Sequence, residues 1–296
     1  MELSLTAFTD KTGAVTGVLV KGKHSGLYQI NAKAVVLATD GIGANAKLVR
    51  LRPDISADVK TSNQPGSQGD GMVLAQKIGA SVTDAKESEL NPTLLAGSPV
   101  IVSETVRGAR AVFVNKEGKR FISELSTRDV TSAAVSKQTG GVAYEIFDQK
   151  VRNKVKQTGA TFELGLAKEG NTIHELAAAA GIDLDNLEKT MTDYNRYAEN
   201  GKDPEFHRPD GFPKVDKPKY YAIEITPAIH YYMGGLTIDG KTRVINTKGQ
   251  PIKGLFAAGE VTGGVHGKNR LGGNSISETI TFGRIAGTQA VKAVKQ

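Results

Sequence analysis

The sequence of 296 residues contains no cysteine and no tryptophan. Without cysteine there can be no disulfides, thiolate metal sites, cysteine nucleophiles or flavin bonded through a cysteine sulfur. No apolar run reaches the roughly 18 to 20 residues of a membrane-spanning helix, so no span is expected. The first residues, MELSLTAFTDKTG, lack the basic start and apolar core of a signal peptide. The compartment is therefore left open: cytoplasmic if Met1 is the native start, and cell-surface or periplasmic otherwise.

Metal-ligand patterns and nucleic-acid signatures are missing as well. The five histidines form no HExxH or similar spacing, so no metal site is predicted. The net charge is +7, but the basic residues are dispersed and are not interleaved with aromatics, so no nucleic-acid partner is expected. Two interpretations of the charge remain: a basic surface without a specific partner, or a basic funnel that attracts an anionic substrate.

The pattern of apolar residues predicts a two-lobed protein that mixes helices and strands. Apolar content of 39% and charged content of 23% are typical of a globular protein, and this length favours two lobes. Composition shifts after Val82, and a stretch rich in Lys, Asp and Pro at 201–219 is interpreted as a linker back to the first lobe. The predicted strands are 3–8, 15–21, 27–38, several within 100–125, and 220–226; the predicted helices are 45–51, one within 61–80, 143–156, 172–181, 184–200, and one from Asn274 or Ser275 to the end.

A glycine pattern follows the third predicted strand. Gly41-x-Gly43-x-x-Ala46 has the form of a dinucleotide fingerprint between a strand and a helix. The helix is short, however, and no acid ends a second strand about 20 residues later, so a tight strand-to-helix crossing is favoured over a pyrophosphate loop. Asp70, between two glycines at a helix start, has two interpretations: a helix cap, or a contact to a cofactor hydroxyl.

The most glycine-dense stretch runs from Gly254 to Gly287. An apolar run ends at Gly259-Glu260, a loop with one arginine and one histidine follows, and then a helix begins. Glycines let the backbone approach a flat or anionic ligand closely, and a helix N-terminus offers it free N–H groups. The stretch therefore predicts a cofactor seat with an arginine beside it.

Four motifs in this order resemble one family: SETVRG (103–108), GKRFISELSTRD (118–129), TPAIHYYMGG (226–235) and the stretch 254–287. Together they resemble the flavoprotein subunit of the fumarate reductase and succinate dehydrogenase family, and within it the soluble fumarate reductases and urocanate reductases. The resemblance implies an α/β plus α+β fold: a Rossmann-like FAD-binding domain interrupted by a capping domain, with the substrate bound between them. The implied boundaries are 1–84 and 216–296 for the FAD-binding domain and 85–215 for the cap.

The chain departs from the family at its start. Family members begin with a strand and a G-x-G-x-x-G loop that holds the FAD pyrophosphate, and residues 1–30 supply neither. The sequence therefore resembles the C-terminal portion of such a protein. We expect the isolated chain to bind FAD weakly or not at all.

The resemblance implies a proton-donating arginine and its relay. Arg128 matches the family's proton donor, and Glu104 and Arg107 match the residues that resupply it. An arginine of ordinary pKa is a poor acid, so it must be held at the substrate and reprotonated. From the residues alone, the alternative is a surface ion-pair cluster of little energetic weight.

The resemblance also implies a second set of residues, which binds the carboxylates of the substrate. His230 and Arg270 match residues that hold a substrate carboxylate, and a guanidinium suits that task because it binds bidentately. Gly273 is placed with them, and Ser103 stands where the family has threonine. Asn91 replaces the histidine of a His-Pro-Thr motif; it donates a hydrogen bond but carries no charge, so the far carboxylate should be bound less tightly.

FAD is the implied cofactor. By resemblance Glu260 contacts the ribitol chain, and Tyr231 replaces a family histidine that lies against the flavin. The remaining implied FAD contacts are Ser275, Ile276, Ala38 and Asp70.

The resulting hypothesis is FAD-dependent reduction of the C=C bond of an unsaturated carboxylate, of the fumarate-to-succinate type, with hydride from flavin N5 and a proton from Arg128. One alternative is a reductase of a different 2-enoate, resembling urocanate or acrylate. Another is a non-catalytic fragment that cannot hold FAD. The partners are a small dicarboxylate or 2-enoate and an electron donor that the sequence does not identify, and the oligomeric state is equally open.

Overall fold

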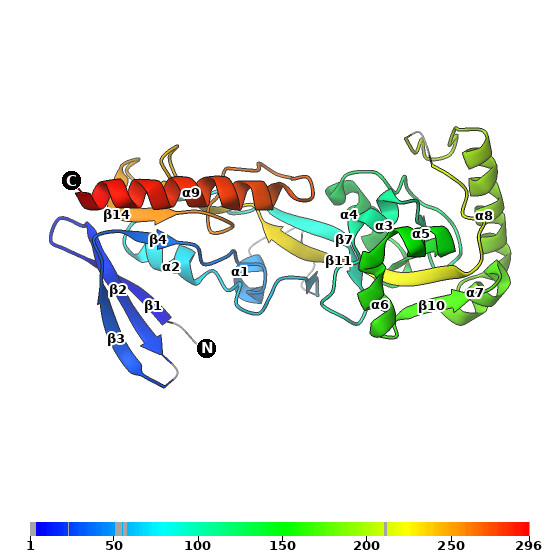
Figure 1. The fold of residues 1–296 in the computed structure, drawn as a ribbon, viewed down its shortest axis with the longest axis horizontal. Coiled ribbons are helices and arrows are strands. Elements are labelled where there is room, and N and C mark those ends of the chain that lie inside the picture. Colours follow the sequence, from blue (N-terminus) through cyan, green and yellow to red (C-terminus); the bar gives the residue numbers. More distant parts are fainter. Residues whose placement is uncertain (1–3, 23, 51–54, 56–57, 210–211, 296) are drawn as a thin grey trace. The chain divides into compact units, whose positions relative to one another are not determined.

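The computed structural model describes residues 4–22, 24–50, 55, 58–209 and 212–295. Two compact units divide these residues: unit 1 contains residues 1–89 and 229–296, and unit 2 contains residues 90–228. The predicted boundaries, 84/85 and 215/216, lie five and thirteen residues earlier. The difference arises because two strands, β7 (Ser88–Leu95) and β11 (Tyr220–Tyr232), run through the observed boundaries. Figure 1 traces both along the chain.

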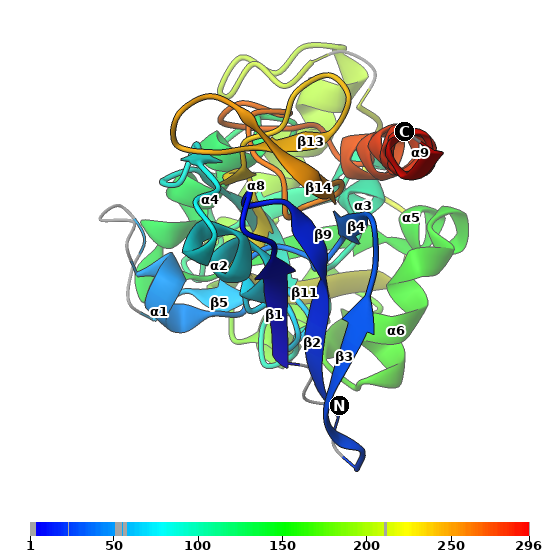
Figure 2. The same cartoon turned by 90° about the vertical axis from the view of Figure 1, so that its left-hand side faces the viewer.

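Unit 1 contains an antiparallel sheet of three strands: β1 (Ser4–Thr9), β2 (Val15–Gly22) and β3 (Gly26–Asn31) (Figure 2). A second sheet has the order β13–β14–β4 and is formed by Arg243–Ile245, Pro251–Ala257 and Val35–Leu37. The stretch 27–38, predicted as one strand, is therefore two strands in different sheets. The two parts separate because the backbone turns away at residues 32–34, after Ala32 pairs with Thr16.

The long C-terminal helix covers the second sheet. Strands β14 and β4 are parallel, and α9 (Asn274–Lys295) runs alongside them in Figure 1. Phe256, Ala258 and Ala286 form a small buried cluster between strand and helix. Because parallel strands end at the same edge, the loops after Leu37 and Ala257 emerge together next to the start of α9. That edge is where the predicted cofactor residues gather.

The rest of unit 1 consists of short elements. They are α1 (Ala46–Val49), β5 (Lys60–Thr61), α2 (Asp70–Lys77), β6 (Val82–Thr83) and β12 (Gly235–Leu236). The predicted helix 45–51 extends past α1 to residue 51, which lies outside the described residues. Gly41 is required by close packing, since a Cβ there would lie 2.4 Å from a carboxylate oxygen of Glu260. This contact does not distinguish a tight strand-to-helix crossing from a pyrophosphate loop, so the tight crossing stays a prediction.

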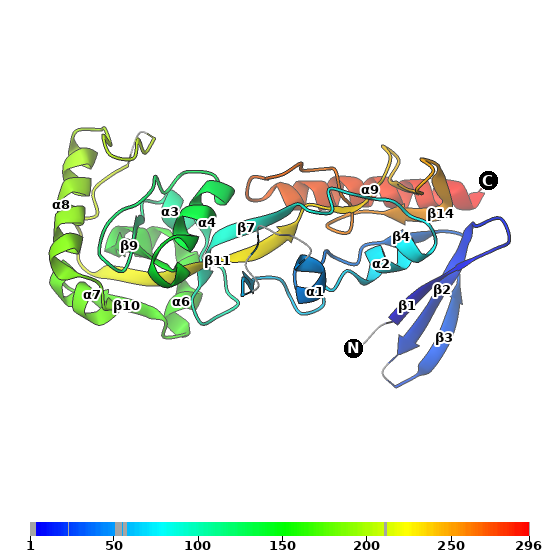
Figure 3. The same cartoon turned by 180° about the vertical axis from the view of Figure 1, so that it is seen from behind.

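A mixed group of helices surrounds the central sheet of unit 2. Its strands follow the order β10–β11–β9–β8, and β7 pairs with β11. The ranges not yet given are β8 (Val112–Val114), β9 (Ala143–Asp148), β10 (Ala167–Gly170), α3 (Glu104–Gly108), α4 (Arg128–Ser136), α5 (Gln149–Lys154), α6 (Gly159–Glu163), α7 (Ile173–Ala180) and α8 (Leu184–Glu199), with 3₁₀ turns η1 (Thr139–Gly141) and η2 (Lys156–Thr158). Figure 3 shows α7 and α8 together beside β10.

Residues 143–156, predicted as one helix, are a strand followed by a short helix. All six residues of β9 are buried, and alternate residues face two different apolar clusters. Tyr144 and Ile146 face the cluster that α7 and α8 cover, while Ala143 and Phe147 face the cluster packed against α3 and α5. A strand that is buried on both faces has a continuous run of apolar residues in its sequence. Hydrophobic periodicity alone does not distinguish such a run from a buried helix.

The helices α7 and α8 begin with side-chain caps, as their sequences suggest. Thr172 accepts a hydrogen bond from Glu175 N, and Asp183 accepts one from Asn186 N. The buried residues of α8, Leu187, Met191 and Tyr194, recur at helical spacing. Within the described residues no helix is long and apolar enough to traverse a bilayer, and no group of His, Asp and Glu is placed to hold a metal ion.

Candidate functional site

In unit 2 the structure brings Glu104, Arg107 and Arg128 together; we name them the arginine–glutamate cluster. Helix α3 places Glu104 and Arg107 one turn apart, and Arg107 Nη2 lies 2.5 Å from Glu104 Oε1. Arg128, the first residue of α4, donates from Nε and Nη2 to the two oxygens of Glu104, at 2.9 and 2.7 Å. This is a bidentate contact, the strongest arrangement of this ion pair.

The cluster is not the exposed ion-pair network that the residues alone also allowed. The side chains of Arg107 and Arg128 are only 9% and 7% exposed, and that of Glu104 is 28% exposed. Burial works to raise the pKa of Glu104, but the hydrogen bonds and charges of Arg128 and Arg107 outweigh it and lower that pKa to about 2. Glu104 is therefore a carboxylate at neutral pH. Two guanidinium groups on one carboxylate leave one net positive charge, which attracts an anion.

A buried ionic network supports Arg107 from behind. Arg107 Nη1 donates to the carbonyl oxygens of Glu124 and Ser126, at 3.0 and 3.1 Å. The Glu124 carboxylate accepts from Arg120 and Arg208, and Arg208 also donates to the carbonyl of Arg107 at 3.0 Å. Sequence reading missed this network, because Arg208 lies 84 residues from Glu124 in the chain. It holds the cluster in one geometry.

Ser103 and Asn91 have distinct local roles in unit 2. Ser103 caps α3, since its Oγ accepts from Thr105 N at 3.3 Å. Asn91 is fully buried in β7, and its Oδ1 accepts from the backbone N and Oγ1 of Thr93, at 2.9 and 3.0 Å. These bonds orient the amide and leave Nδ2 buried without a partner among the described residues. An unpaired buried donor is uncommon and is suited to a ligand acceptor.

In unit 1 a cavity of about 560 Å³ lies at the carboxyl edge of β4 and β14, beside the start of α9; we name it the Glu260 cavity. Ligands of open α/β sheets bind at this edge. The lining residues are Ala38, Asp40, Gln64, His230, Tyr231, Ala258, Gly259, Glu260, Arg270, Ser275 and Thr279. The cavity therefore unites six residues that the sequence assigned to cofactor or substrate: Ala38, His230, Tyr231, Glu260, Arg270 and Ser275.

Two acids in this cavity have pKa values pushed in opposite directions. Burial, assisted by the charge of Asp40, raises the pKa of Glu260 to about 8, although Tyr232 N donates to it at 2.8 Å. Burial also acts to raise the pKa of Asp40, but hydrogen bonds from Ser67, Gly41 and Gln64 outweigh it and lower that pKa. At neutral pH Glu260 is thus protonated and Asp40 ionised. Glu260 can then donate a hydrogen bond as well as accept one.

Arg270 is held near the cavity by an acid and an aromatic ring. Its Nη2 lies 3.3 Å from Glu89 Oε2, and its guanidinium carbon lies 4.3 Å from the centre of the Tyr231 ring. The side chain is 4% exposed, yet Nε has no partner among the described residues. His230 Nδ1 lies 2.9 Å from Ser62 Oγ, which orients the imidazole. Arg270 and His230 thus present directed donors to a ligand.

Three of the predicted site residues in unit 1 do not line the Glu260 cavity. Asp70 is exposed at the start of α2, and the helix cap is Gly69, so the interpretation of Asp70 as the cap is wrong. Gly69 takes that place because its backbone has a φ of +82°. Gly273, with a φ of +87°, ends the loop before α9, and the Ile276 side chain is 65% exposed on α9. Their roles as FAD or substrate contacts stay predictions.

Sequence reading missed Asp40 and Glu89. Asp40 has a φ of +65°, which is uncommon for a residue other than glycine and frequent at functional sites. Its place between Thr39 and Gly41, in a glycine-rich turn after an apolar strand, is the signal that could have found it. Glu89 offers no comparable signal, because it reaches Arg270 only through the fold.

The residues of the Glu260 cavity fit the flavin half of FAD. The buried Nε of Arg270, a lining residue, has no partner among the described residues and suits a polar ligand. A protonated Glu260 complements hydroxyl groups, and a Cβ at Gly259 would meet nothing within 4 Å, so the turn there is open. FAD bound here would be held by Glu260, Ser275 and neighbouring backbone at the start of α9.

These features define a flavin-binding α/β protein with an inserted domain. A model of the FAD binding domain family matches residues 2–276. The fumarate reductase (cytochrome) of Shewanella frigidimarina is 46% identical over 288 residues, covering 97% of this chain and 50% of that protein. The NADH:acrylate oxidoreductase of Vibrio harveyi is 40% identical over 269 residues, covering 86% of this chain and 26% of that protein.

A solved structure agrees with these relatives. The open conformation of a flavocytochrome c3 fumarate reductase superimposes with a TM-score of 0.81 at 45% identity, covering 97% of this chain and 51% of that one. The chain belongs to the FAD-binding flavoprotein family of fumarate reductases and succinate dehydrogenases. It spans half the length of the Shewanella relative.

Proposed function

We propose that this chain carries the flavin-side and proton-donating residues of an enzyme that reduces the C=C bond of an unsaturated carboxylate, of the fumarate-to-succinate type. The observation that carries the proposal is the bidentate contact of Arg128 with Glu104, backed by Arg107. A guanidinium this well oriented, beside a second one and a carboxylate, fits a proton donor with its resupply. The relatives named above support the substrate class.

FAD, when bound, would supply the hydride for one carbon of the double bond. Arg128 gives a proton to the other carbon and becomes a neutral guanidine. Glu104 then returns a proton to Arg128 after taking one from Arg107, and Arg107 regains its own from solvent. The low pKa of Glu104 keeps it an acceptor between transfers, so it carries protons without storing them.

Arg270 and His230 bind a carboxylate of the substrate in this proposal. A positive charge at that carboxylate withdraws electron density from the double bond and stabilises the negative charge that develops after hydride addition. Glu89 keeps Arg270 in place, and the ring of Tyr231 supports its guanidinium. These two contacts limit the rotamers of Arg270. Less side-chain conformational entropy is therefore lost when the substrate binds.

The proposal is tested with a panel of unsaturated acids. The protein is supplied with excess FAD, and flavin absorbance checks that the cofactor is bound. Given reduced methyl viologen as electron source, this FAD-loaded enzyme should oxidise the viologen when fumarate, acrylate or urocanate is added, and should be inactive with the saturated acids. Product analysis should show the reduced acid. Bleaching of viologen that is independent of every unsaturated acid, or none with any of them, would contradict the proposed reaction.

Asn91 adds one detail to the proposed substrate binding: it donates a hydrogen bond, without a charge, to the end of the substrate that lies away from Arg270 and His230. We expect Asn91→Asp to raise the KM for fumarate about tenfold or more, because a buried carboxyl replaces the free Nδ2 donor while Oδ1 still accepts from Thr93. The KM for acrylate, which has no second carboxylate, should change little. Equal effects on both acids would show that Asn91 does not contact the far group.

A further inference from the structure

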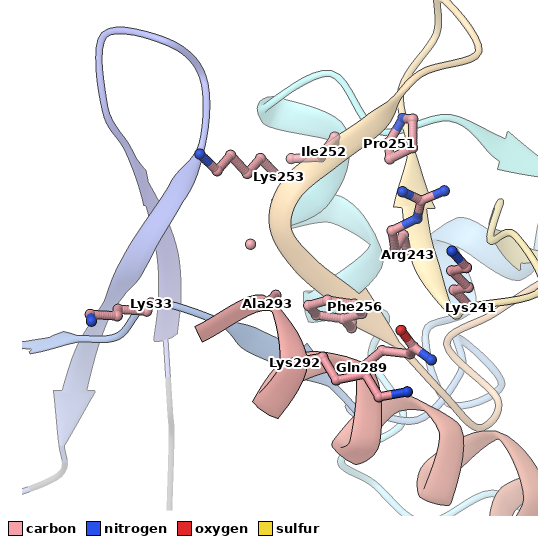
Figure 4. Close-up of a pocket in the computed structure, with 11 residues that line it drawn as sticks. Lys33, Lys241, Arg243, Pro251, Ile252, Lys253, Phe256, Gln289, Lys292 and Ala293 are labelled. Atoms are coloured by element: carbon pink, nitrogen blue, oxygen red, sulfur yellow. The ribbon is translucent and has the colours of Figure 1, made fainter. Parts of the chain in front are cut away.

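A second cavity of unit 1 has a lining with charge of one sign only. It encloses about 710 Å³ at the start of β14 and the end of α9, a size typical of small-molecule sites. Five of its lining residues are cationic and none is acidic: Lys33, Lys241, Arg243, Lys253 and Lys292. Figure 4 draws these side chains, with Lys33 and Lys253 on one side of β14 and Lys241 and Arg243 on the other; we name the cavity the lysine cavity.

Most of this positive charge is not neutralised by the protein. Arg243 pairs with Asp239, at 2.6 Å between Nη2 and Oδ2. Lys253 lies close enough to lower the pKa of Asp10 slightly, behind that acid's hydrogen bonds to Thr12 and Ala14. For Lys33, Lys241 and Lys292 the described residues contain no ion-pair partner. Like charges gathered around one cavity repel each other until an anion enters.

Helix electrostatics explains only one of these lysines. Lys292 lies in the last turn of α9, where a cation complements the helix dipole. Lys241 and Lys253 lie on a turn and a strand, and Lys33 lies in the loop before β4, so no helix end accounts for them. Three parts of the chain therefore contribute cations to this lining: Lys33, the β13–β14 region and the end of α9.

The part of the cavity lining that carries no charge is mostly apolar. Ile252 and Phe256 are 7% and 3% exposed and form the floor, while Pro251 and Ala293 border the space in Figure 4. Gln289 adds one neutral polar side chain. A site of this kind suits a ligand with several negative charges and an organic body, because such a ligand uses both the cationic rim and the floor.

This cavity is distinct from the Glu260 cavity. The two lie at opposite ends of β14: one is lined by Pro251 to Phe256, the other by Ala258 to Glu260. Along α9, Thr279 and Lys292 are thirteen residues apart, about 20 Å at the rise of an α-helix. A ligand in the lysine cavity would therefore leave the flavin side free.

We propose that the lysine cavity binds a small organic molecule that carries two or more phosphate groups. Phosphates are favoured over a single carboxylate because the unpaired lysines are spread over several segments, and a chain of phosphates can reach more than one of them. The site is independent of the proposed reductase chemistry.

Isothermal titration with ATP at low ionic strength tests this proposal on the whole chain. ATP should bind, inorganic triphosphate should bind more weakly because it lacks the organic body, and added salt should weaken both. The double variant Lys241→Ala/Lys253→Ala should raise the Kd for ATP at least about tenfold, since two charge-assisted contacts are lost.

A matched control removes the same charge elsewhere. Lys137→Ala/Lys168→Ala changes two exposed lysines of unit 2 and should leave the Kd for ATP nearly unchanged. Both double variants alter only exposed side chains, and circular dichroism checks that they fold. No binding of ATP, or equal weakening in both double variants, would overturn the proposal; the second result would mean attraction by net charge only.

Discussion

Replacing Arg128 with leucine should lower the turnover of the FAD-loaded enzyme about a thousandfold or more, with a far smaller change in substrate affinity. General-acid groups contribute about 10² to 10⁴ in rate, and a leucine side chain has no proton to donate. The reason lies in the geometry: Arg128 is clamped by both oxygens of Glu104, so its remaining N–H groups have fixed directions. Steady-state rates with reduced viologen, and substrate binding by flavin absorbance, measure the two quantities.

The control for this prediction is Arg196→Leu. Arg196 is an arginine of the same unit that pairs with an acid, Asp193, but its side chain is 60% exposed. An exposed pair contributes little, so turnover should stay near the starting value. If Arg128→Leu kept more than about a tenth of the turnover, Arg128 could not be the proton donor.

The fold class was predictable because much of it depends on local patterns. Helix α8 was predicted from its apolar spacing, and α9 from the glycine-dense loop before it. Strand β9 was taken for a helix because it is buried on both faces. The unit boundaries shifted for a related reason: β11 continues through Pro227 and crosses from one unit to the other, which a break at proline does not predict.

The candidate site was predictable where motifs carry it. Glu104, Arg107 and Arg128 lie within 25 residues of one another and were assigned by resemblance, and the structure brings them into contact. Glu89 and Asp40 were missed because their partners come from distant segments: Glu89 meets Arg270, and Asp40 meets Ser67. A pair of this kind exists only after the chain has folded, so no spacing rule indicates it.

Glu145 is the clearest case of a residue whose environment the sequence did not reveal. It lies in the middle of β9, opposite Phe113 of β8 and Ile223 of β11, on the face that forms an apolar cluster. The residue is 0% exposed, and neither carboxyl oxygen has a hydrogen-bond partner among the described residues. Burial raises its pKa to about 8, and the charge of Arg107 lowers it only in part.

This burial predicts a loss of stability as the pH rises. In the unfolded chain Glu145 ionises near its ordinary pKa of 4.5, while in the folded protein it stays protonated up to about pH 8. Below pH 4.5 both states carry the proton, so the group has no effect. Between the two values the unfolded state binds fewer protons, and the free energy of unfolding falls by about 1.4 kcal/mol per pH unit. Well above pH 8 the loss is complete, about 5 kcal/mol.

Glu145→Gln should remove this pH dependence, because the amide is neutral in both states. Relative to the unmodified protein, the variant should gain about 3 to 4 kcal/mol in free energy of unfolding between pH 4.5 and pH 8, measured by urea denaturation. Comparing the two proteins at each pH cancels the other titrating groups and any change in packing. Glu169→Gln is the control, since Glu169 is exposed on the neighbouring strand β10 and pairs with Lys219. A difference between Glu145→Gln and the unmodified protein that stayed constant with pH would mean that Glu145 is ionised in the folded state, and that the interior of unit 2 admits a charge there.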